Sequence, residues 1–593
     1  MERYTYRPLD KTHKEIRVLD VLPGSGKQTV RCQMRHVFLT SDPVPKYETI
    51  SYCWGDARLR WYIIVDGSPL NVPSSAAKAL TRMRRKRSRR TLWIDAVCIK
   101  QSDLLEREWQ VGLMKEIYSA TVCCLVYLGD GKSLARPAAK SLKIVQSLVE
   151  TSTSIDSAIR QERIKLPEGF NSDAVQTLYF EPWFTRLWIL QEVALPCQTI
   201  CHWGSLVYDF RQLVIIGDFW LNRVKLTQLR NHSEFLDRLL AINRISKMLQ
   251  ADESEPMRFA GVPLSTLHLA TDLFRASDSH DYVYSVLGLC YADTLSRWSS
   301  LLEPRYTISP RDVFRDATRA AIEEAQSLQI LVRGADSLCC SPDTILRASP
   351  SWVVSWDHSY NYDEDAVPLH FNFAAADDNH PIMYGRHSHD QDLLLLGGVD
   401  ACQVVAVSRP VSRNSAQVWS NILEIIDFCL ISARPMDGNH INIREEMDIG
   451  PALVGGRNVG RKRTSRDAFE EMLAVRQTIQ HRATPLTSTL QQSPIDSDEI
   501  IGGAEAYLKD LIAMLHRRKV FVTTSGQVGI GPEDMEVNDK VVVLYGSRIP
   551  FILRPVGDEY RLVGPCYLQG IMDGEAVRQH VAEEKEDTMF VIR

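Results

Sequence analysis

Over the first 130 residues, apolar runs of strand length alternate with stretches of helical periodicity. Residues 16–22, 47–53 and 61–65 are predicted to be strands, and residues 74–85 a helix. The nearly continuous apolar run 91–99 (TLWIDAVCI) is typical of a strand that is covered on both faces. The pattern therefore indicates a mixed α/β region from the start of the chain.

The next stretch repeats the alternation. A helix is predicted over 104–120, because its apolar residues recur on one face, and the apolar run 121–129 (TVCCLVYLG) follows as a buried strand. Strand, helix, strand with both strands apolar favours a doubly wound α/β fold with a parallel sheet. A further helix is predicted over 180–195.

Beyond this region the chain changes character several times, and 593 residues are too many for one hydrophobic core. Near the end of the chain, short predicted strands are separated by turns that contain glycine or proline, which predicts a small antiparallel sheet or barrel. The polar stretch before them predicts a loop with a helix near 466–480. The predicted domains are an N-terminal extension with a strand (1–44), an α/β domain (45–200), a mostly helical region (201–330), a mixed region (331–433), a partly disordered loop (434–499) and a β-rich C-terminal module (500–593).

Composition excludes some classes of protein. A net charge of −5 argues against bulk binding of nucleic acid, and no apolar stretch is long enough to predict a membrane span. The N-terminus lacks the apolar core of a secretory signal. Thirteen scattered cysteines, several of them inside apolar runs, fit reduced core thiols. We therefore expect a soluble, cytoplasmic, multidomain protein.

Two motifs resemble binding sites but do not meet their requirements. The glycines and lysine of residues 22–29 lack the spacing of a nucleotide phosphate loop, so a turn is predicted there. Cys197, Cys201 and His202 have no second ligand pair at a suitable spacing, whereas a structural zinc needs four ligands. No metal site is therefore predicted.

Two charged motifs have structural interpretations. The run RMRRKRSRR (82–90) is predicted to be a solvated helix end, with an anion-facing patch or an import signal as alternatives. Asp103 and Glu106 fit a capping arrangement, in which Asp103 is the N-cap and Glu106 reaches back to a free backbone N–H.

The stretch PWFTRLWILQEVALP (182–196) is more informative. On a helix, Phe184, Trp188 and Glu192 share one face, so the carboxylate of Glu192 extends an aromatic stripe. A buried carboxylate costs several kcal/mol unless it is paired or hydrogen-bonded. Two explanations stay open: an arginine such as Arg186 neutralises Glu192, or Glu192 lines a cleft that holds a ligand.

Three blocks, YETISYCWGD (47–56), LWIDAVCIKQSDLLEREWQVGLMKEIYSATVCCLVYLGD (92–130) and PWFTRLWILQEVALP, closely resemble the fungal heterokaryon-incompatibility (HET) domain. The resemblance covers about residues 45–200. It implies a role in allorecognition, in which HET-domain proteins trigger the death of fused, genetically different cells. The family is also distantly similar to TIR domains, a doubly wound α/β fold whose enzymatic members cleave NAD.

The TIR-like resemblance implies a site. The form W-x-x-x-E from Trp188 to Glu192 resembles the helix that carries the catalytic glutamate, so Glu192 is the predicted catalytic residue. In parallel α/β sheets, ligands bind beyond the carboxyl ends of the strands. The predicted binding residues, with NAD as a substrate rather than a cofactor, are Ser51, Trp54, Gly55, Asp95 and Trp188.

Three function classes follow. The first is an NAD+ nucleosidase that acts when self-assembled through the HET domain, under the control of an unknown incompatibility partner protein. The second is a non-enzymatic adaptor that recruits a cell-death effector, in which Trp188 and Glu192 are structural and Glu192 has an arginine partner with no open cleft nearby. The alternative to ligand binding at Trp54 is that this side chain only plugs the core. The third, a cysteine hydrolase using Cys53 or Cys98, is disfavoured because both residues lie in predicted strands.

Overall fold

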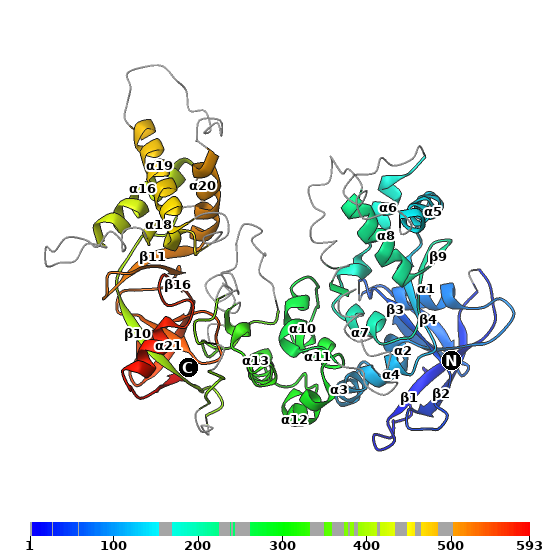
Figure 1. Cartoon of the computed structure of the whole chain (residues 1–593). Helices are drawn as coiled ribbons and strands as arrows, with labels where there is room; N and C mark the ends of the chain where they lie inside the picture. Colours follow the sequence, from blue (N-terminus) through cyan, green and yellow to red (C-terminus); the bar gives the residue numbers. More distant parts are fainter. Residues whose placement is uncertain are drawn as a thin grey trace. The chain divides into compact units, whose positions relative to one another are not determined.

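The structure is a computed structural model, and it describes residues 3–26, 28–56, 58–152, 169–223, 238, 241–242, 261–332, 349–357, 373–377, 380–384, 390–411, 415–432, 448–456, 464–483 and 502–593. The chain divides into two units, residues 1–313 and 314–593 (Figure 1). The residues predicted as one helical region, 201–330, are therefore shared between the two units. The residues predicted as N-terminal extension and α/β domain lie in the first unit.

A nine-stranded mixed sheet organises the first unit, in the order β5-β4-β2-β1-β6-β3-β7-β8-β9. β3 is parallel to both of its neighbours, β6 and β7, and β7 is parallel to β8. In contrast, β1 is antiparallel to both of its neighbours, β2 and β6. The prediction of a parallel sheet thus holds for the central strands and is wrong for the whole. The strands are β1 (Glu15–Val21), β2 (Arg31–Phe38), β3 (Glu48–Tyr52), β4 (Arg60–Val65), β5 (Ser68–Pro73), β6 (Arg90–Trp93), β7 (Cys124–Gly129), β8 (Thr199–Trp203) and β9 (Leu206–Asp209).

Three predicted elements are shorter than their apolar patterns suggested. The run 91–99 is a strand only to Trp93 and then turns into α2 (Asp95–Cys98). The helix predicted over 104–120 is α3 (Leu104–Gly112) followed by α4 (Met114–Ser119). An apolar run cannot by itself separate a buried strand from a buried helical turn, because both are covered on all sides.

The helix predicted over 180–195 is also divided. It consists of a 3-10 turn, η2 (Pro182–Thr185), and a short helix, α7 (Ile189–Ala194). Arg186 is extended between them, and the backbone here pairs with Arg275: the Arg275 N–H donates to Thr185 O at 2.7 Å and the Leu187 N–H donates to Arg275 O at 3.0 Å. This tertiary pairing competes with helical hydrogen bonds and interrupts the helix.

Further helices lie in the first unit, and the last of them extends into the second. The helical character predicted for 201–330 is confirmed among the described residues. The helices are α1 (Ser74–Met83), α5 (Ala135–Ser152), α6 (Ser172–Tyr179), α8 (Phe210–Arg223), α10 (Leu264–Thr271), α11 (Asp281–Leu287), α12 (Ala292–Leu302) and α13 (Pro310–Ala325), the last of which crosses the boundary between the units.

The second unit contains an eight-stranded sheet in the order β13-β14-β15-β17-β10-β11-β12-β16. Because β13 also pairs with β10, five strands close into a barrel, as the C-terminal pattern predicted. Buried apolar side chains, such as Val399, Val543 and Ile552, fill its core. The strands are β10 (Leu394–Val407), β11 (Arg518–Thr523), β12 (Val528–Pro532), β13 (Lys540–Leu544), β14 (Phe551–Val556), β15 (Glu559–Pro565), β16 (Tyr567–Leu568) and β17 (Thr588–Ile592).

The second unit also contains helices. The predicted helix near 466–480 is confirmed as α19, whereas the disorder predicted for part of 434–499 falls largely outside the described residues. Within the described part of the chain, no helix has the length and apolar character needed to cross a membrane. The helices are α16 (Ser415–Ser432), α18 (Ile449–Leu453), α19 (Ser465–Ala483), α20 (Gly502–Leu515) and α21 (Glu575–Ala582).

Candidate functional site

The carboxylate of Glu192 lies at the centre of a buried polar cluster. Glu192 is on α7 and is 5% exposed, and Ser51 is at the carboxyl-terminal part of β3. The Ser51 hydroxyl donates to Glu192 Oε2 at 2.5 Å and accepts from Trp183 Nε1 at 2.6 Å. Ser51 thus links the strand, the 3-10 turn and the helix through one oxygen atom.

Arg186 neutralises this carboxylate. Its Nη1 and Nη2 donate to Glu192 Oε2 and Oε1 at 3.1 and 3.3 Å, and the Tyr118 hydroxyl donates to Oε1 at 3.3 Å. The interrupted helix makes this possible, because extended backbone at Arg186 lets its side chain reach a residue six positions later. The expected pairing of Glu192 with Arg186 is therefore confirmed, whereas the continuous helix on which Phe184, Trp188 and Glu192 would share one face is not formed.

A second pair lies where β6 ends. Asp95 begins α2, and its Oδ2 accepts from Trp54 Nε1 at 2.8 Å. The Trp54 side chain is 38% exposed, so it does not simply plug the core. Gly55 has φ +67°, and a Cβ there would meet open space, which fits a turn that only glycine adopts without strain.

The positive charge of Arg186 interacts with the carboxylates of both Glu192 and Asp95. Burial lowers the pKa of Arg186, but the charges of Glu192 and Asp95 outweigh that effect and raise it overall. Burial raises the pKa of Asp95, while Arg186 and the hydrogen bond from Trp54 oppose that shift. Burial also raises the pKa of Tyr118 far above its ordinary value, and the charge of Glu192 adds to it. Tyr118 is therefore a neutral hydroxyl donor.

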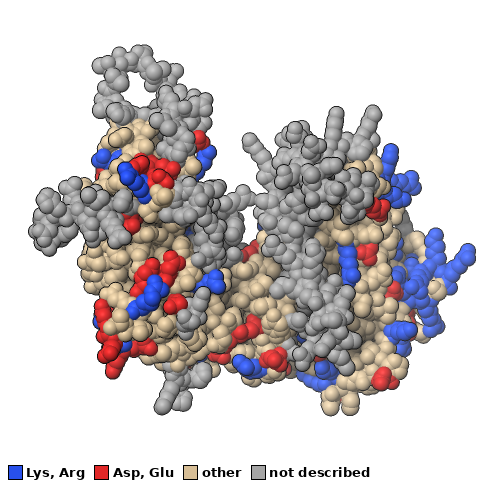
Figure 2. Space-filling model, in the orientation of Figure 1, with Lys and Arg blue, Asp and Glu red and all other residues tan. Residues whose placement is uncertain are grey.

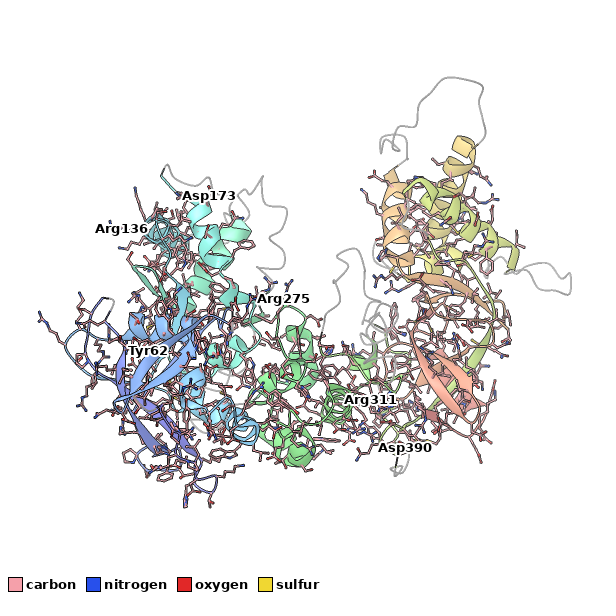
Figure 3. All side chains as sticks on the ribbon, turned by 180° about the vertical axis from the view of Figure 1, so that it is seen from behind. Tyr62, Arg136, Asp173, Arg275, Arg311 and Asp390 are labelled. Carbon is pink, nitrogen blue, oxygen red and sulfur yellow. The ribbon has the colours of Figure 1, made fainter. Side chains whose placement is uncertain are left out.

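Trp188 points to a different partner. Its Nε1 donates to Asp281 Oδ2 at 3.0 Å, and Asp281 Oδ1 accepts from the Tyr306 hydroxyl at 2.7 Å. Next to it, Gln191 Nε2 donates to Ser285 O at 2.6 Å. The structure thus ties α7 to α11, and the residues around 275–306 form part of the support for the Glu192 cluster. Figure 3 labels Arg275, whose backbone makes the neighbouring contact.

The predicted site residues therefore fall into groups. Ser51 contacts Glu192, and Trp54 contacts Asp95, whereas Trp188 turns to Asp281. Arg186, which the sequence analysis gave only as a structural partner of Glu192, belongs to the cluster, and Tyr118, Trp183 and Asp281 were not predicted at all. Trp183 and Tyr118 read as core aromatics in the sequence, and Asp281 comes from a distant segment, so no local spacing marks them.

Other candidate chemistry is weak. Burial raises the pKa of the Cys98 thiol to about 12, so Cys98 is a poor nucleophile. Among the described residues, no group of three His, Cys, Asp or Glu side chains is arranged to hold a metal ion.

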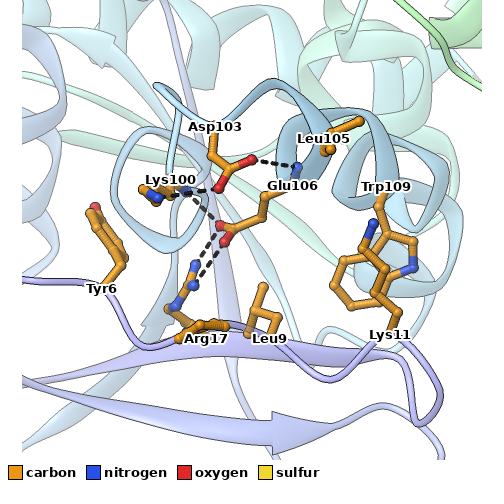
Figure 4. Close-up of a pocket in the computed structure, with 10 residues that line it drawn as sticks. Tyr6, Leu9, Lys11, Arg17, Lys100, Asp103, Leu105, Glu106 and Trp109 are labelled. Atoms are coloured by element: carbon orange, nitrogen blue, oxygen red, sulfur yellow. Dashed lines mark hydrogen bonds and ion pairs between the residues drawn. The ribbon is translucent and has the colours of Figure 1, made fainter.

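A cavity of about 260 Å³ lies at another place, between the N-terminal strand-bearing segment and α3 (Figure 4). The N-cap prediction is confirmed there, since Asp103 Oδ1 accepts from the Glu106 N–H at 3.2 Å. The Glu106 carboxylate, however, accepts from the Lys100 N–H at 2.7 Å and from Arg17 at 2.6 and 2.9 Å. Its role is to neutralise the fully buried Arg17, which no helix-capping pattern reveals.

Comparisons with known proteins agree with the resemblance of the three sequence blocks. The family model described as "Heterokaryon incompatibility protein (HET)" matches residues 47–192, and the one described as "Het-6 beta-barrel domain" matches residues 472–591. The chain is 26% identical to "Heterokaryon incompatibility protein 6, OR allele" of Neurospora crassa over 663 aligned positions, which cover 97% of this chain and 96% of that protein. No solved structure matches the chain.

Proposed function

Because this chain is a HET-domain protein, similar along its length to an incompatibility protein of Neurospora crassa, we propose that it acts in heterokaryon incompatibility as a regulated cell-death protein of fungal allorecognition. In this proposal the unit with the HET domain produces the death signal. The unit with the barrel recognises an incompatibility partner protein or holds the first unit inactive. Self-assembly through the HET domain is the active state.

The finer proposal is that the death signal is cleavage of NAD. One observation supports it: the Ser51–Glu192 contact and the Trp54–Asp95 contact both lie where strands of the central sheet end, β3 and β6 respectively. This is the edge of an α/β sheet at which ligands bind. The exposed face of Trp54 offers stacking to a planar ring.

The chemistry requires one carboxylate near the ribose. The bond between ribose C1′ and the nicotinamide nitrogen breaks, and its electron pair leaves with neutral nicotinamide. Water adds to C1′ and releases a proton, which gives ADP-ribose. Glu192 would stabilise the positive charge that grows on the ribose in the transition state. Ser51 would orient Glu192 through its 2.5 Å hydrogen bond.

Arg186 sets a condition for this reaction. While both of its terminal nitrogens contact the Glu192 carboxylate, the negative charge that the ribose needs is already balanced. Substrate hydroxyls must therefore replace part of the Arg186 contact. Such a rearrangement on self-assembly would make the isolated chain inactive and the assembled one active.

The test is release of nicotinamide from NAD by the purified full-length chain over a series of protein concentrations. Glu192→Gln should abolish release, and Trp54→Ala should strongly reduce it without a large loss of stability, because Trp54 is partly exposed. Glu116→Gln, at an exposed carboxylate that pairs with Lys14, is the matched control. Undiminished cleavage by folded Glu192→Gln would eliminate Glu192 as the catalytic residue.

The second candidate, a non-enzymatic adaptor, has one specific observation in its favour. The contact of Arg186 with both oxygens of Glu192 is the arrangement expected of a structural carboxylate. An adaptor would leave NAD intact at every concentration. Its killing activity in fungal cells would survive Glu192→Gln, provided that the variant folds, whereas an NAD-cleaving enzyme would lose killing.

A further inference from the structure

One face of the first unit is strongly basic. Between residues 58 and 90 the chain carries ten Lys or Arg residues and a single acidic residue, Asp66, although the whole protein has a net charge of −5. Figure 2 shows Lys and Arg side chains gathered at the right of the view, where α1 and β4 lie in Figure 1. The ten residues are Arg58, Arg60, Lys78, Arg82, Arg84, Arg85, Lys86, Arg87, Arg89 and Arg90.

Some of these cations serve the fold. Arg90 forms two hydrogen bonds with the Glu48 carboxylate at 2.6 and 2.7 Å, and Arg84 donates to the backbone carbonyls of Gln28, Thr29 and Gly26. Arg82 donates to Gly204 O. These contacts fix both ends of the loop that joins α1 to β6.

The cations within that loop project into solvent. Arg85, Lys86, Arg87 and Arg89 are all exposed. Arg85 is 3.9 Å from Glu48 and Arg89 donates to the neutral Gln33 amide oxygen, and neither Lys86 nor Arg87 has an ion-pair partner among the described residues. The structure therefore holds a cluster of exposed positive charge, only partly balanced by Glu48, on a loop with fixed ends.

Two exposed aromatic side chains lie on the neighbouring strand β4. Trp61 is 53% exposed and Tyr62 is 62% exposed, and Arg60 precedes them. β4 packs against α1, whose exposed Lys78 lies along the same helix that leads into the basic loop. The segment before β2 contacts both the basic loop and β4. Its Gly24 N–H donates to Arg85 O of the basic loop, and its Val30 O accepts from the Ile64 N–H of β4.

We propose that the basic surface formed by Trp61, Lys78, Arg85, Lys86, Arg87 and Arg89 docks the protein on an anionic lipid bilayer. Lysine and arginine clusters bind the negative surface of such bilayers, and tryptophan and tyrosine favour the boundary between headgroups and acyl chains. A nucleic acid fits less well. Successive residues of a strand point to opposite faces, so Trp61 and Tyr62 do not form one stacking platform for consecutive bases.

Binding to vesicles tests the proposal with the full-length chain. Sedimentation with phosphatidylcholine vesicles that contain about one-third phosphatidylserine should recover the protein, whereas pure phosphatidylcholine vesicles should not. The triple variant Arg85→Ala, Lys86→Ala, Arg87→Ala should weaken binding about a hundredfold, at roughly 1 kcal/mol for each cation near the surface and tenfold for each 1.4 kcal/mol. Trp61→Ala should weaken the binding that remains at high salt, where the attraction between charges is screened.

The matched control removes the same charge elsewhere. Arg136→Ala, Lys140→Ala, Lys143→Ala changes three exposed cations of α5. This control should bind anionic vesicles as the unchanged chain does. Equal weakening in both triple variants, or no binding to anionic vesicles, would overturn the proposal. Binding to single-stranded RNA without vesicle binding would assign the surface to nucleic acid instead.

Discussion

Arg186 donates from two nitrogens to the two carboxylate oxygens of Glu192, at 3.1 and 3.3 Å, across a break in the helix that the sequence pattern predicts as continuous. Arg186 and Glu192 retain only 17% and 7% side-chain exposure. Either the two residues stabilise the fold as a pair, or substrate separates them during catalysis. The free energy of unfolding of variants at these two positions measures how strongly the pair stabilises the fold, independently of any role in catalysis.

Arg186→Met should lower the free energy of unfolding by about 3–5 kcal/mol, because it leaves the Glu192 charge buried without its partner. Adding Glu192→Gln to that variant should restore part of the loss, since the amide is neutral and still accepts from Ser51. Urea unfolding of the two single variants and the double variant measures this coupling. Strictly additive losses would mean that the contact does not stabilise the fold.

Ser51→Ala should cost about 1–3 kcal/mol of stability, because it removes a donor to Glu192 and leaves the indole N–H of Trp183 buried without an acceptor. Thermal unfolding measures the loss. Ser88→Ala, at an exposed loop position, is the control and should change little. An unchanged melting temperature for Ser51→Ala would show that water replaces the hydroxyl.

His280 should make stability fall as pH rises above neutral. Burial lowers the pKa of His280, but hydrogen bonds to Asp278 and to the Ile308 carbonyl outweigh it and raise the pKa overall. Both partners only accept, at 2.7 and 2.8 Å, so the ring satisfies both only when both of its nitrogens carry protons. The two His280 hydrogen bonds therefore stabilise the folded chain fully below about pH 6.5, the usual pKa of histidine, and this stabilisation is lost as pH rises through the raised pKa of His280.

Asp278 limits the same contact on the acid side. The hydrogen bond from His280 lowers the pKa of Asp278, so its contribution is present above the ordinary carboxyl pKa and is lost as pH falls through the lowered value. Urea unfolding at a series of pH values should show this window for the unchanged chain. His280→Gln should flatten the decline on the alkaline side, and an identical decline in that variant would assign it to another group.

Two adjacent glycines of β10 should respond differently to alanine. A Cβ at Gly398 would lie 2.4 Å from the backbone oxygen of Val543, whereas the three atoms nearest to one at Gly397 all belong to the Met383 side chain, at 2.6–2.9 Å. Gly398→Ala should therefore separate β10 from β13 and cost about 1–3 kcal/mol or more, and Gly397→Ala should cost less. Urea unfolding followed by circular dichroism compares them. The reverse order would mean that β13 does not pack here as described.

The sequence by itself determined the element types and much of their order. Strands β1, β3, β4 and β7 and helices α1 and α19 follow from apolar period and turn residues, which are local properties of the chain. The N-cap role of Asp103 is equally local, because it depends on a side chain and the backbone N–H three residues later. The pairing of Glu192 with Arg186 was one of two open explanations for the same reason: both residues lie in one short stretch.

Only the tertiary structure decided the rest. Pairing of the backbone around Arg186 with Arg275 interrupts the predicted helix, and the strand predicted over 91–99 ends at Trp93 because Asp95 starts a helical turn. Trp188 turns to Asp281, from a segment 93 residues away along the chain. Contacts of this kind depend on which surfaces meet in the folded chain, and hydrophobic period carries no information about distant partners. The chemistry at Glu192 is therefore set by residues that its own sequence neighbourhood does not contain.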